Sequence, residues 1–114
     1  MPLNDNALNA MADHLATLAT SASLHSADPG ATGINETTAG RQTVTWTGAA
    51  TGDIAISAQE NFTGGGASAA CTYVGLWNGA GTVFYGGFAL TGDQTFNAAG
   101  EYTLETLTLD GSAS

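Results

Sequence analysis

Hydrophobic residues near the start of the chain recur with helical spacing. Leu8, Met11, Leu15 and Leu18 follow one another at alternating steps of three and four residues, and alanine fills many of the positions between them. This periodicity predicts an α-helix within residues 1–22 that carries one apolar stripe. Asn4 or Asp5 can cap its first turn by accepting a hydrogen bond from a free backbone N–H. The stripe suits two roles, packing on the rest of the same chain or forming a seam between copies.

After Asp28 the pattern changes to short runs of β-branched and aromatic residues, separated by glycine, threonine and serine. Such runs predict β-strands. They cover residues 41–47, 53–58, a short piece at Phe62, 70–77, 82–90, 94–96 and 102–109. A spacing of about 8 to 12 residues between turn signals is typical of an antiparallel β-sandwich or jelly roll. We therefore predict a mainly β fold with an N-terminal α-helix.

The pattern also predicts how the chain is organised. We expect a helix at 1–22, a turn-rich connector at 23–40, a β-sandwich domain at 41–110 and a short tail at 111–114. The segment 78–81, Asn-Gly-Ala-Gly, is the strongest hairpin turn, because asparagine and glycine accept a positive φ at little steric cost.

Alternation in the last predicted strand changes phase near Glu105. Tyr102 and Leu104 lie on one face, whereas Leu107 and Leu109 lie on the other. A β-bulge, or a second apolar face covered by a neighbouring subunit, would explain the change. The second explanation makes Leu107 and Leu109 candidate interface residues, together with Leu8, Met11, Leu15 and Leu18 of the helix.

Charge excludes several classes of partner. Among 114 residues there are ten Asp and Glu but a single cation, Arg41, which gives a net charge of -9. Proteins bind nucleic acids and anionic membranes largely through clustered Lys and Arg, so we expect neither as a partner. Only 10% of the residues are charged, against about 25% in a typical soluble domain. We therefore expect a partner to cover part of the surface.

The segment 23–33, Ser-Leu-His-Ser-Ala-Asp-Pro-Gly-Ala-Thr-Gly, holds the most reactive side chains. A nucleophilic site would need His25 beside a serine and oriented by a carboxylate. Side chains so close in sequence diverge in an extended segment, so we interpret this stretch as a turn built by Asp28, Pro29 and Gly30. A small hydrolase that uses His25 is the competing hypothesis.

Other chemistry has little support in the sequence. His14 and His25 lack the spacing of metal ligands, a single cysteine, Cys71, excludes an internal disulfide, and the glycine-rich segments lack the Gly-Lys-Ser/Thr of a phosphate loop. We predict no enzyme activity, no cofactor and no metal. Five aromatic residues at strand spacing suit either the core or a sugar-binding platform. They are Tyr73, Trp77, Phe84, Tyr85 and Phe88.

Five motifs occur in a fixed order along residues 23–109. They are Leu-His-Ser-Ala-Asp-Pro-Gly from Leu24, Gly-Ile-Asn-Glu from Gly33, Arg-Gln-Thr-Val-Thr-Trp from Arg41 to Trp46, Gly-Leu-Trp ending at Trp77 with a later Gly-Gly, and Phe-Asn-Ala-Ala-Gly-Glu-Tyr ending at Tyr102. This order resembles a family of short virion proteins from tailed bacteriophages of actinobacteria, described as tail-fibre-like or minor structural proteins. The resemblance implies a non-enzymatic role in the virus particle, with the motif residues His25, Asp28, Pro29, Gly30, Arg41, Trp46, Trp77 and Tyr102 as framework.

Two locations in the particle fit that resemblance. A small acidic domain with few charges suits a capsid decoration protein, which would bind the major capsid protein and other copies of itself, as a trimer on the capsid surface. The alternative is a minor tail or tail-fibre-like protein that binds host-surface glycans through the aromatic hairpin. A receptor-binding fibre generally needs a long shaft, so the sequence favours the capsid.

Overall fold

The computed structural model describes residues 4–50, 53–92 and 94–110 of the chain. A helix, α1, spans Asp5–Leu18. The strands are β1 (Ser21–His25), β2 (Gln42–Thr43), β3 (Asp53–Ala55), β4 (Glu60–Phe62), β5 (Tyr73–Trp77), β6 (Phe84–Ala89), β7 (Tyr102–Leu104) and β8 (Thr108–Asp110).

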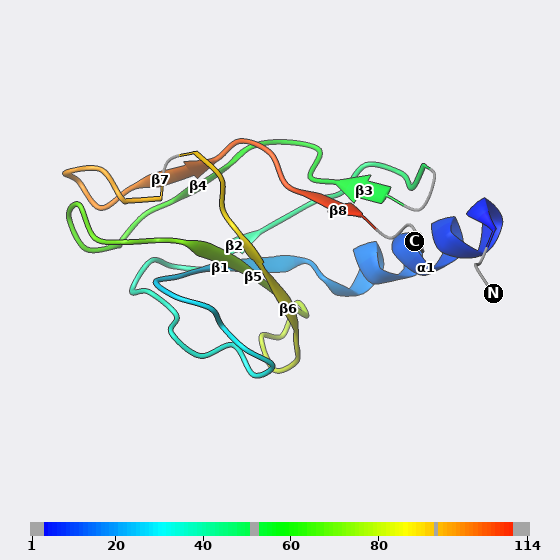
Figure 1. Cartoon of the computed structure of the whole chain (residues 1–114), viewed down its shortest axis with the longest axis horizontal. Helices are drawn as coiled ribbons and strands as arrows, with labels where there is room; N and C mark the ends of the chain where they lie inside the picture. Colours follow the sequence, from blue (N-terminus) through cyan, green and yellow to red (C-terminus); the bar gives the residue numbers. More distant parts are fainter. Residues whose placement is uncertain (1–3, 51–52, 93, 111–114) are drawn as a thin grey trace.

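The strands form two layers (Figure 1). One layer is an antiparallel sheet in the order β2-β1-β5-β6, and the other consists of the antiparallel pairs β3-β8 and β4-β7. The predicted mainly β, antiparallel fold with an N-terminal helix is confirmed.

The core lies between the layers. Its largest side chains come from both of them, so each layer buries one apolar face against the other. They include Leu24, Val74 and Leu76 from the sheet, and Ile54, Phe62, Leu104 and Leu109 from the strand pairs. Leu107 also belongs to this core. Leu107 and Leu109 are therefore buried within the chain, and the expectation that they form an exposed interface is wrong.

Helix α1 begins at its cap and ends earlier than predicted. The side chain of Asn4 accepts a hydrogen bond of 3.0 Å from the backbone N–H of Ala7. The helix ends at Leu18, because the chain turns into β1 two residues beyond its cap, Ala19. The molecule measures 46 Å by 24 Å by 24 Å. The helix extends along its long axis, beyond the sheets (Figure 1).

Strand β1 was not predicted. The hydrophobic pattern predicts residues 21–22 in the helix segment and residues 23–25 in a connector, but Ser21–His25 forms a strand between β2 and β5. Its residues from Ala22 to His25 are buried on both faces. Ala22 and Leu24 of the core do alternate with Ser23 and His25, but the run is short and lacks β-branched residues, which weakens the signal used to find strands.

The last predicted strand is two strands. Tyr102 of β7 pairs with Phe62, and Leu109 of β8 pairs with Ile54. Residues 105–107 lie between the two strands, outside either ladder. This interruption resets the alternation near Glu105, so neither a bulge within one strand nor a neighbouring subunit is needed to explain it.

Several other strands are shorter than predicted. In the segment 41–47, only β2 is a strand, and Trp46 forms an isolated bridge with Ile56. In the segment 94–96, Thr95 forms a bridge with Ala70. The predicted hairpin turn is confirmed: the N–H of Gly81, at φ 74°, donates to the carbonyl of Asn78 at 2.9 Å.

Candidate functional site

A buried chain of hydrogen bonds links three polar side chains from two neighbouring strands, β1 and β5, on the outer face of the sheet. The indole Nε1 of Trp77 donates to the Oγ of Ser23 at 2.8 Å. The same Oγ lies 2.6 Å from His25 Nε2, and His25 Nδ1 lies 2.8 Å from the carbonyl oxygen of Ile34. Ser23 and His25 are fully buried.

The partners fix the direction of each bond. A carbonyl oxygen can only accept, so Nδ1 of His25 carries a proton and donates to Ile34. In the neutral imidazole Nε2 is then an acceptor, and the hydroxyl of Ser23 donates to it while accepting from Trp77. Every polar atom of the three side chains is satisfied, which makes this arrangement a stable framework element.

The loop that follows β1 folds over this face of the sheet. Asp28 Oδ1 accepts from the N–H of Gly30 at 2.9 Å, and Gly30 has a φ of 63°. This is the predicted turn at Asp28, Pro29 and Gly30, although His25 lies in the strand before it. Pro29 is buried against Gly87, where any Cβ would collide with the proline ring.

Two more glycines leave room for the side chains of His25 and Trp77. A Cβ at Gly75 would lie 2.6 Å from His25 Nε2, and one at Gly33 would lie 2.6 Å from the Trp77 ring. Gly75 also pairs with both Ser23 and Gly87, which places it in the middle of the covered face. Close packing on this face of the sheet therefore requires glycine at positions 33, 75 and 87, where a side chain would collide with its neighbours.

Arg41 packs on the ring of Trp77 and forms an ion pair with Glu36. Its Nε and Nη2 donate to the two carboxylate oxygens of Glu36 at 3.0 and 2.8 Å, and its guanidinium carbon lies 3.9 Å from the centroid of the Trp77 ring. Hydrogen bonding to Glu36 raises the pKa of Arg41 above its ordinary value, and the charge of Glu36 acts in the same direction against the opposing effect of burial. The single cation of the chain is thus occupied by a planar, bidentate contact.

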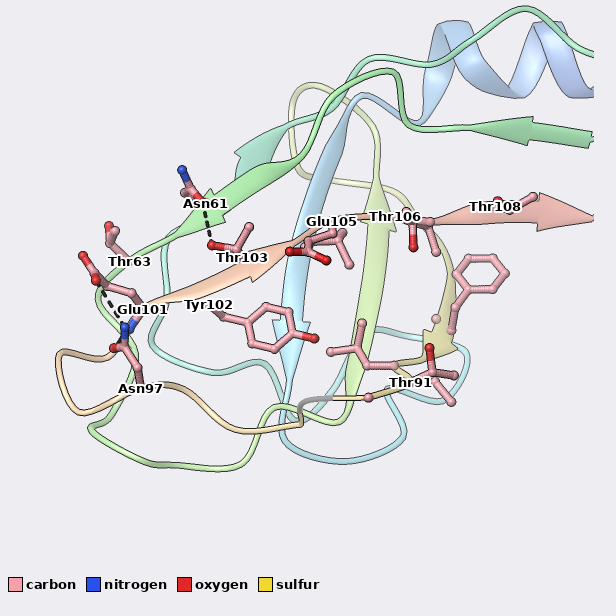
Figure 2. A pocket seen from close by; sticks show the side chains of 17 residues that line it. Asn61, Thr63, Thr91, Asn97, Glu101, Tyr102, Thr103, Glu105, Thr106 and Thr108 are labelled. Carbon is pink, nitrogen blue, oxygen red and sulfur yellow. Dashed lines mark hydrogen bonds between the residues drawn. The ribbon is translucent and has the colours of Figure 1, made fainter.

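A groove opens on the other side of the molecule, between β6 and β7 (Figure 2). It encloses about 1250 Å³. Its apolar lining includes Phe88, Leu104 and Leu107, while Glu101 and Glu105 contribute carboxylates. The carboxylate of Glu105 and the ring of Tyr102 reach into the same space (Figure 2).

No protein-family model, curated protein or solved structure matches this chain. The resemblance to phage virion proteins therefore stays a prediction from the sequence motifs.

The reactive side chains of segment 23–33 do not assemble a nucleophilic site in this conformation. Ser23 and His25 are in contact, as the hydrolase hypothesis requires, but both are closed off from solvent. His25 is oriented by a backbone carbonyl, and the Asp28 carboxylate is used by the turn. A substrate would have to displace the covering loop to reach the hydroxyl of Ser23.

The helix stripe divides between two environments. Leu8 is buried, and Leu15 packs against the core as a partly buried residue. Met11 is 60% exposed and Leu18 is 39% exposed. One part of the stripe therefore packs in the same chain, while Met11 and Leu18 are exposed, and the seam between copies stays a prediction.

The five aromatic residues do not gather on one exposed face. The rings of Trp77 and Phe84 pack against each other with centroids 4.9 Å apart, and Phe88 packs against the core. Tyr85 is 38% exposed, next to an exposed Val83. Trp46 donates from Nε1 to the carbonyl of Ala19 at 2.8 Å, which fastens the end of α1 to the sandwich.

The parts of the chain that the structure describes are residues 4–50, 53–92 and 94–110. In those parts, no group of three or more His, Cys, Asp or Glu side chains could hold a metal ion. No helix there has both the length and the apolar character needed to span a membrane.

Several residues of the site were missed by the sequence analysis. Glu36 was quoted only as part of a motif, yet it holds Arg41, and Gly75 and Gly87 were not assigned a role. The repeated Gly-Gly in the hairpin was the one available signal for the covered face. No local sequence pattern predicts the groove, because the residues that line it come from segments far apart in sequence.

Proposed function

We propose that this protein is a structural component of a bacteriophage virion and that it binds the capsid surface as a decoration protein. The observation that carries the proposal is the convergence of four sequence motifs on one packed cluster. His25, Gly33, Arg41 and Trp77 belong to different motifs. Arg41 lies over the Trp77 ring, Gly33 leaves room for that ring, and Ser23 links the indole nitrogen of Trp77 to His25. Motifs that cooperate in this way specify a framework, which supports a structural role better than a catalytic one.

Self-association through α1 is the second part of the proposal. Met11 and Leu18 are exposed and seven residues apart, so they lie on the same face of the helix. The helix extends beyond the sheets, where copies can approach without contact between the sandwich domains (Figure 1). Because the net charge of -9 makes copies repel one another, short-range apolar contacts must hold them together. We propose a trimer.

Single substitutions on α1 test the seam. Met11→Asp and Leu18→Asp place a charge in the proposed contact, and we expect each to convert the oligomer to monomer without changing the far-ultraviolet circular dichroism spectrum. Ala10→Asp is the matched control, because it adds the same charge at an exposed position off the stripe. Leu15→Asp is unsuitable, since Leu15 packs against the core. A wild-type protein that sediments as a monomer at all concentrations would contradict the seam.

The location on the particle is tested by copy number and by deletion. A decoration protein is present in purified particles at a copy number comparable to that of the major capsid protein, whereas a tail protein is present in a few copies. Phage lacking the protein should adsorb normally and lose resistance to heat or osmotic shock. Deletion particles with undiminished head stability that no longer adsorb would place the protein on the tail.

A tail protein that binds host glycans is the second candidate, and the exposed Tyr85 beside Val83 favours it. An exposed tyrosine offers a sugar a flat apolar face and a hydroxyl group. Under this candidate, Tyr85→Ala abolishes binding to host cell wall and leaves the melting temperature unchanged. Under the decoration proposal, the wild-type protein does not bind cell wall.

A further inference from the structure

The groove between β6 and β7 lies beside two strand edges that no described strand covers. Within residues 4–50, 53–92 and 94–110, β6 pairs only with β5 and β7 pairs only with β4. The edge of a sheet presents backbone donors and acceptors to any strand that can reach it. A strand placed in the groove would extend the sheet β2-β1-β5-β6 by one member.

The lining of the groove matches an extended segment with two different faces. The half-buried Phe88 lines it beside Leu104, Leu107 and Tyr102, whose side chains are already buried in the core, and exposed threonines and two glutamates supply its polar lining. In a β-strand, successive side chains point to opposite sides. A partner strand that alternates apolar and polar residues would therefore place one face against Phe88 and leave the other to the polar lining.

Charge decides between a second copy and a different protein. Glu101 and Glu105 line the groove, and the only Lys or Arg of this chain, Arg41, is held by Glu36 on the covered face. Glu101 accepts a hydrogen bond of 3.3 Å from Asn97, which leaves its charge uncompensated. A second copy would bring net charge -9 and no cation to the groove, so it is a poor occupant.

We propose that this groove is a docking site for an extended segment of a different protein, one that alternates apolar residues with Lys or Arg and adds as a strand to the outer edge of β6. The inference goes beyond the proposed function, because it holds whether that partner belongs to a capsid, a tail or neither. Backbone hydrogen bonds to β6 supply the alignment, the half-buried Phe88 supplies apolar contact, and Glu101 and Glu105 select a basic sequence.

The probe is a capped peptide of about nine residues, near the upper end of the usual range of strand lengths. It alternates valine with polar residues, with lysine at both ends and at the centre and threonine between them. Titration into the isotope-labelled full chain, followed by NMR, should shift and protect the backbone amides of β6. Two control peptides carry either glutamate in place of lysine or N-methyl groups on the amides that would face β6. Neither should bind.

Variants of the protein test the charge. Removing one exposed carboxylate, as in Glu105→Gln or Glu101→Gln, should weaken binding by about two- to fivefold, and more at low salt than at high salt. Glu60→Gln is the control, because Glu60 lies in β4 outside the groove lining and its loss should change the affinity by less than about twofold.

Each other outcome overturns the proposal. Equal binding of the N-methylated peptide would exclude strand addition, and equal binding of the glutamate peptide would exclude charge selection. Amide shifts confined to other elements would place the peptide elsewhere, and no binding of the lysine peptide would remove the site. Protection of β6 that rises with protein concentration, without peptide, would make a second copy the occupant. All of these are measured on the isolated protein, so they are distinct from any failure of the virion proposal.

Discussion

Replacing His25 with alanine removes the central member of a fully buried hydrogen-bond chain. The carbonyl of Ile34 then loses its donor, and the hydroxyl of Ser23 loses its acceptor. Leaving a buried polar group unsatisfied costs about 1–3 kcal/mol, and truncating a large buried side chain to alanine costs about 2–5 kcal/mol. These costs overlap, because Ser23 can rotate and water can enter the space. We expect His25→Ala to lower the free energy of unfolding by about 3–5 kcal/mol.

A loss of that size is a large part of the stability of a domain, which is typically about 5–15 kcal/mol. Urea unfolding, followed by tryptophan fluorescence and by circular dichroism, would measure it. Ser26→Ala is the matched control from the same segment, because the Ser26 hydroxyl is exposed and makes only a long contact of 3.4 Å. Its effect should stay within about 0.5 kcal/mol.

A double-mutant cycle with Ser23→Ala separates the hydrogen bond from general loss of packing. Residues in one network show coupling of about 0.5–3 kcal/mol, so the two substitutions together should cost less than the sum of their separate effects. Strictly additive effects, or a loss below about 1 kcal/mol for His25→Ala, would refute the framework assignment. A purified protein that hydrolyses esters or glycans, and stops doing so in His25→Ala, would establish the catalytic reading instead.

Three further substitutions probe the covered face. Gly87→Ala, whose Cβ meets the ring of Pro29, should lower the free energy of unfolding by about 1–3 kcal/mol, whereas Gly48→Ala, with open space around it, should not, as chemical denaturation would report. Trp77→Ala should cost about 3–5 kcal/mol, and a variant that keeps its melting temperature while losing host cell-wall binding would contradict its placement in the framework. Arg41→Lys loses the bidentate contact and the stacking on Trp77, and calorimetry should find a decrease of about 0.5–1 kcal/mol. Because the pKa of Arg41 is raised in the folded chain, its contribution is fully present below the pKa of the unfolded chain and is lost only as the pH rises through the folded-state pKa, so this effect should not vary around neutral pH.

The elements that the sequence predicted are those whose side chains alternate or repeat. Helix α1 follows from its apolar period, and β5 and β6 follow from aromatic and branched residues on either side of an Asn-Gly turn. The period also predicted which side of α1 is apolar. The buried residues of the helix are Leu8 and Ala12, however, and Met11 of the predicted stripe is exposed to solvent. Alanine contributes little to a hydrophobic period, so the pattern could not show that shift.

Strand β1 shows why part of the site was not predictable. Ala22 and Leu24 face the core, while Ser23 and His25 face a loop that arrives from later in the chain. The polar pair looked like a turn because its partners, Trp77 and Ile34, are brought to it only by the fold. Local propensity describes one segment at a time. It could not predict that Ser23 and His25 are buried, because their hydrogen-bond partners come from distant parts of the chain.

The groove depends on strand pairing and not on composition. Glu101 and Glu105 have no special sequence context, and their position beside an uncovered edge follows from β7 pairing with β4 and β6 pairing with β5. The change of phase near Glu105 did mark the point where the chain leaves one partner strand for another. Its meaning required knowledge of which strands those partners were.

The central place of β1 in its sheet also constrains how the chain folds. Trp77 follows Ser23 by 54 residues, and Thr103 follows Asn61 by 42 residues, so these contacts form only after long loops have closed. Among the strand pairs within the described residues, only β5 and β6 are joined by a short hairpin. High contact order of this kind slows folding, because loop-closure entropy is lost before the contacts compensate for it. During synthesis, the strand that carries Ser23 and His25 leaves the ribosome early, and its β5 edge stays unpaired in the nascent chain until Trp77 has followed.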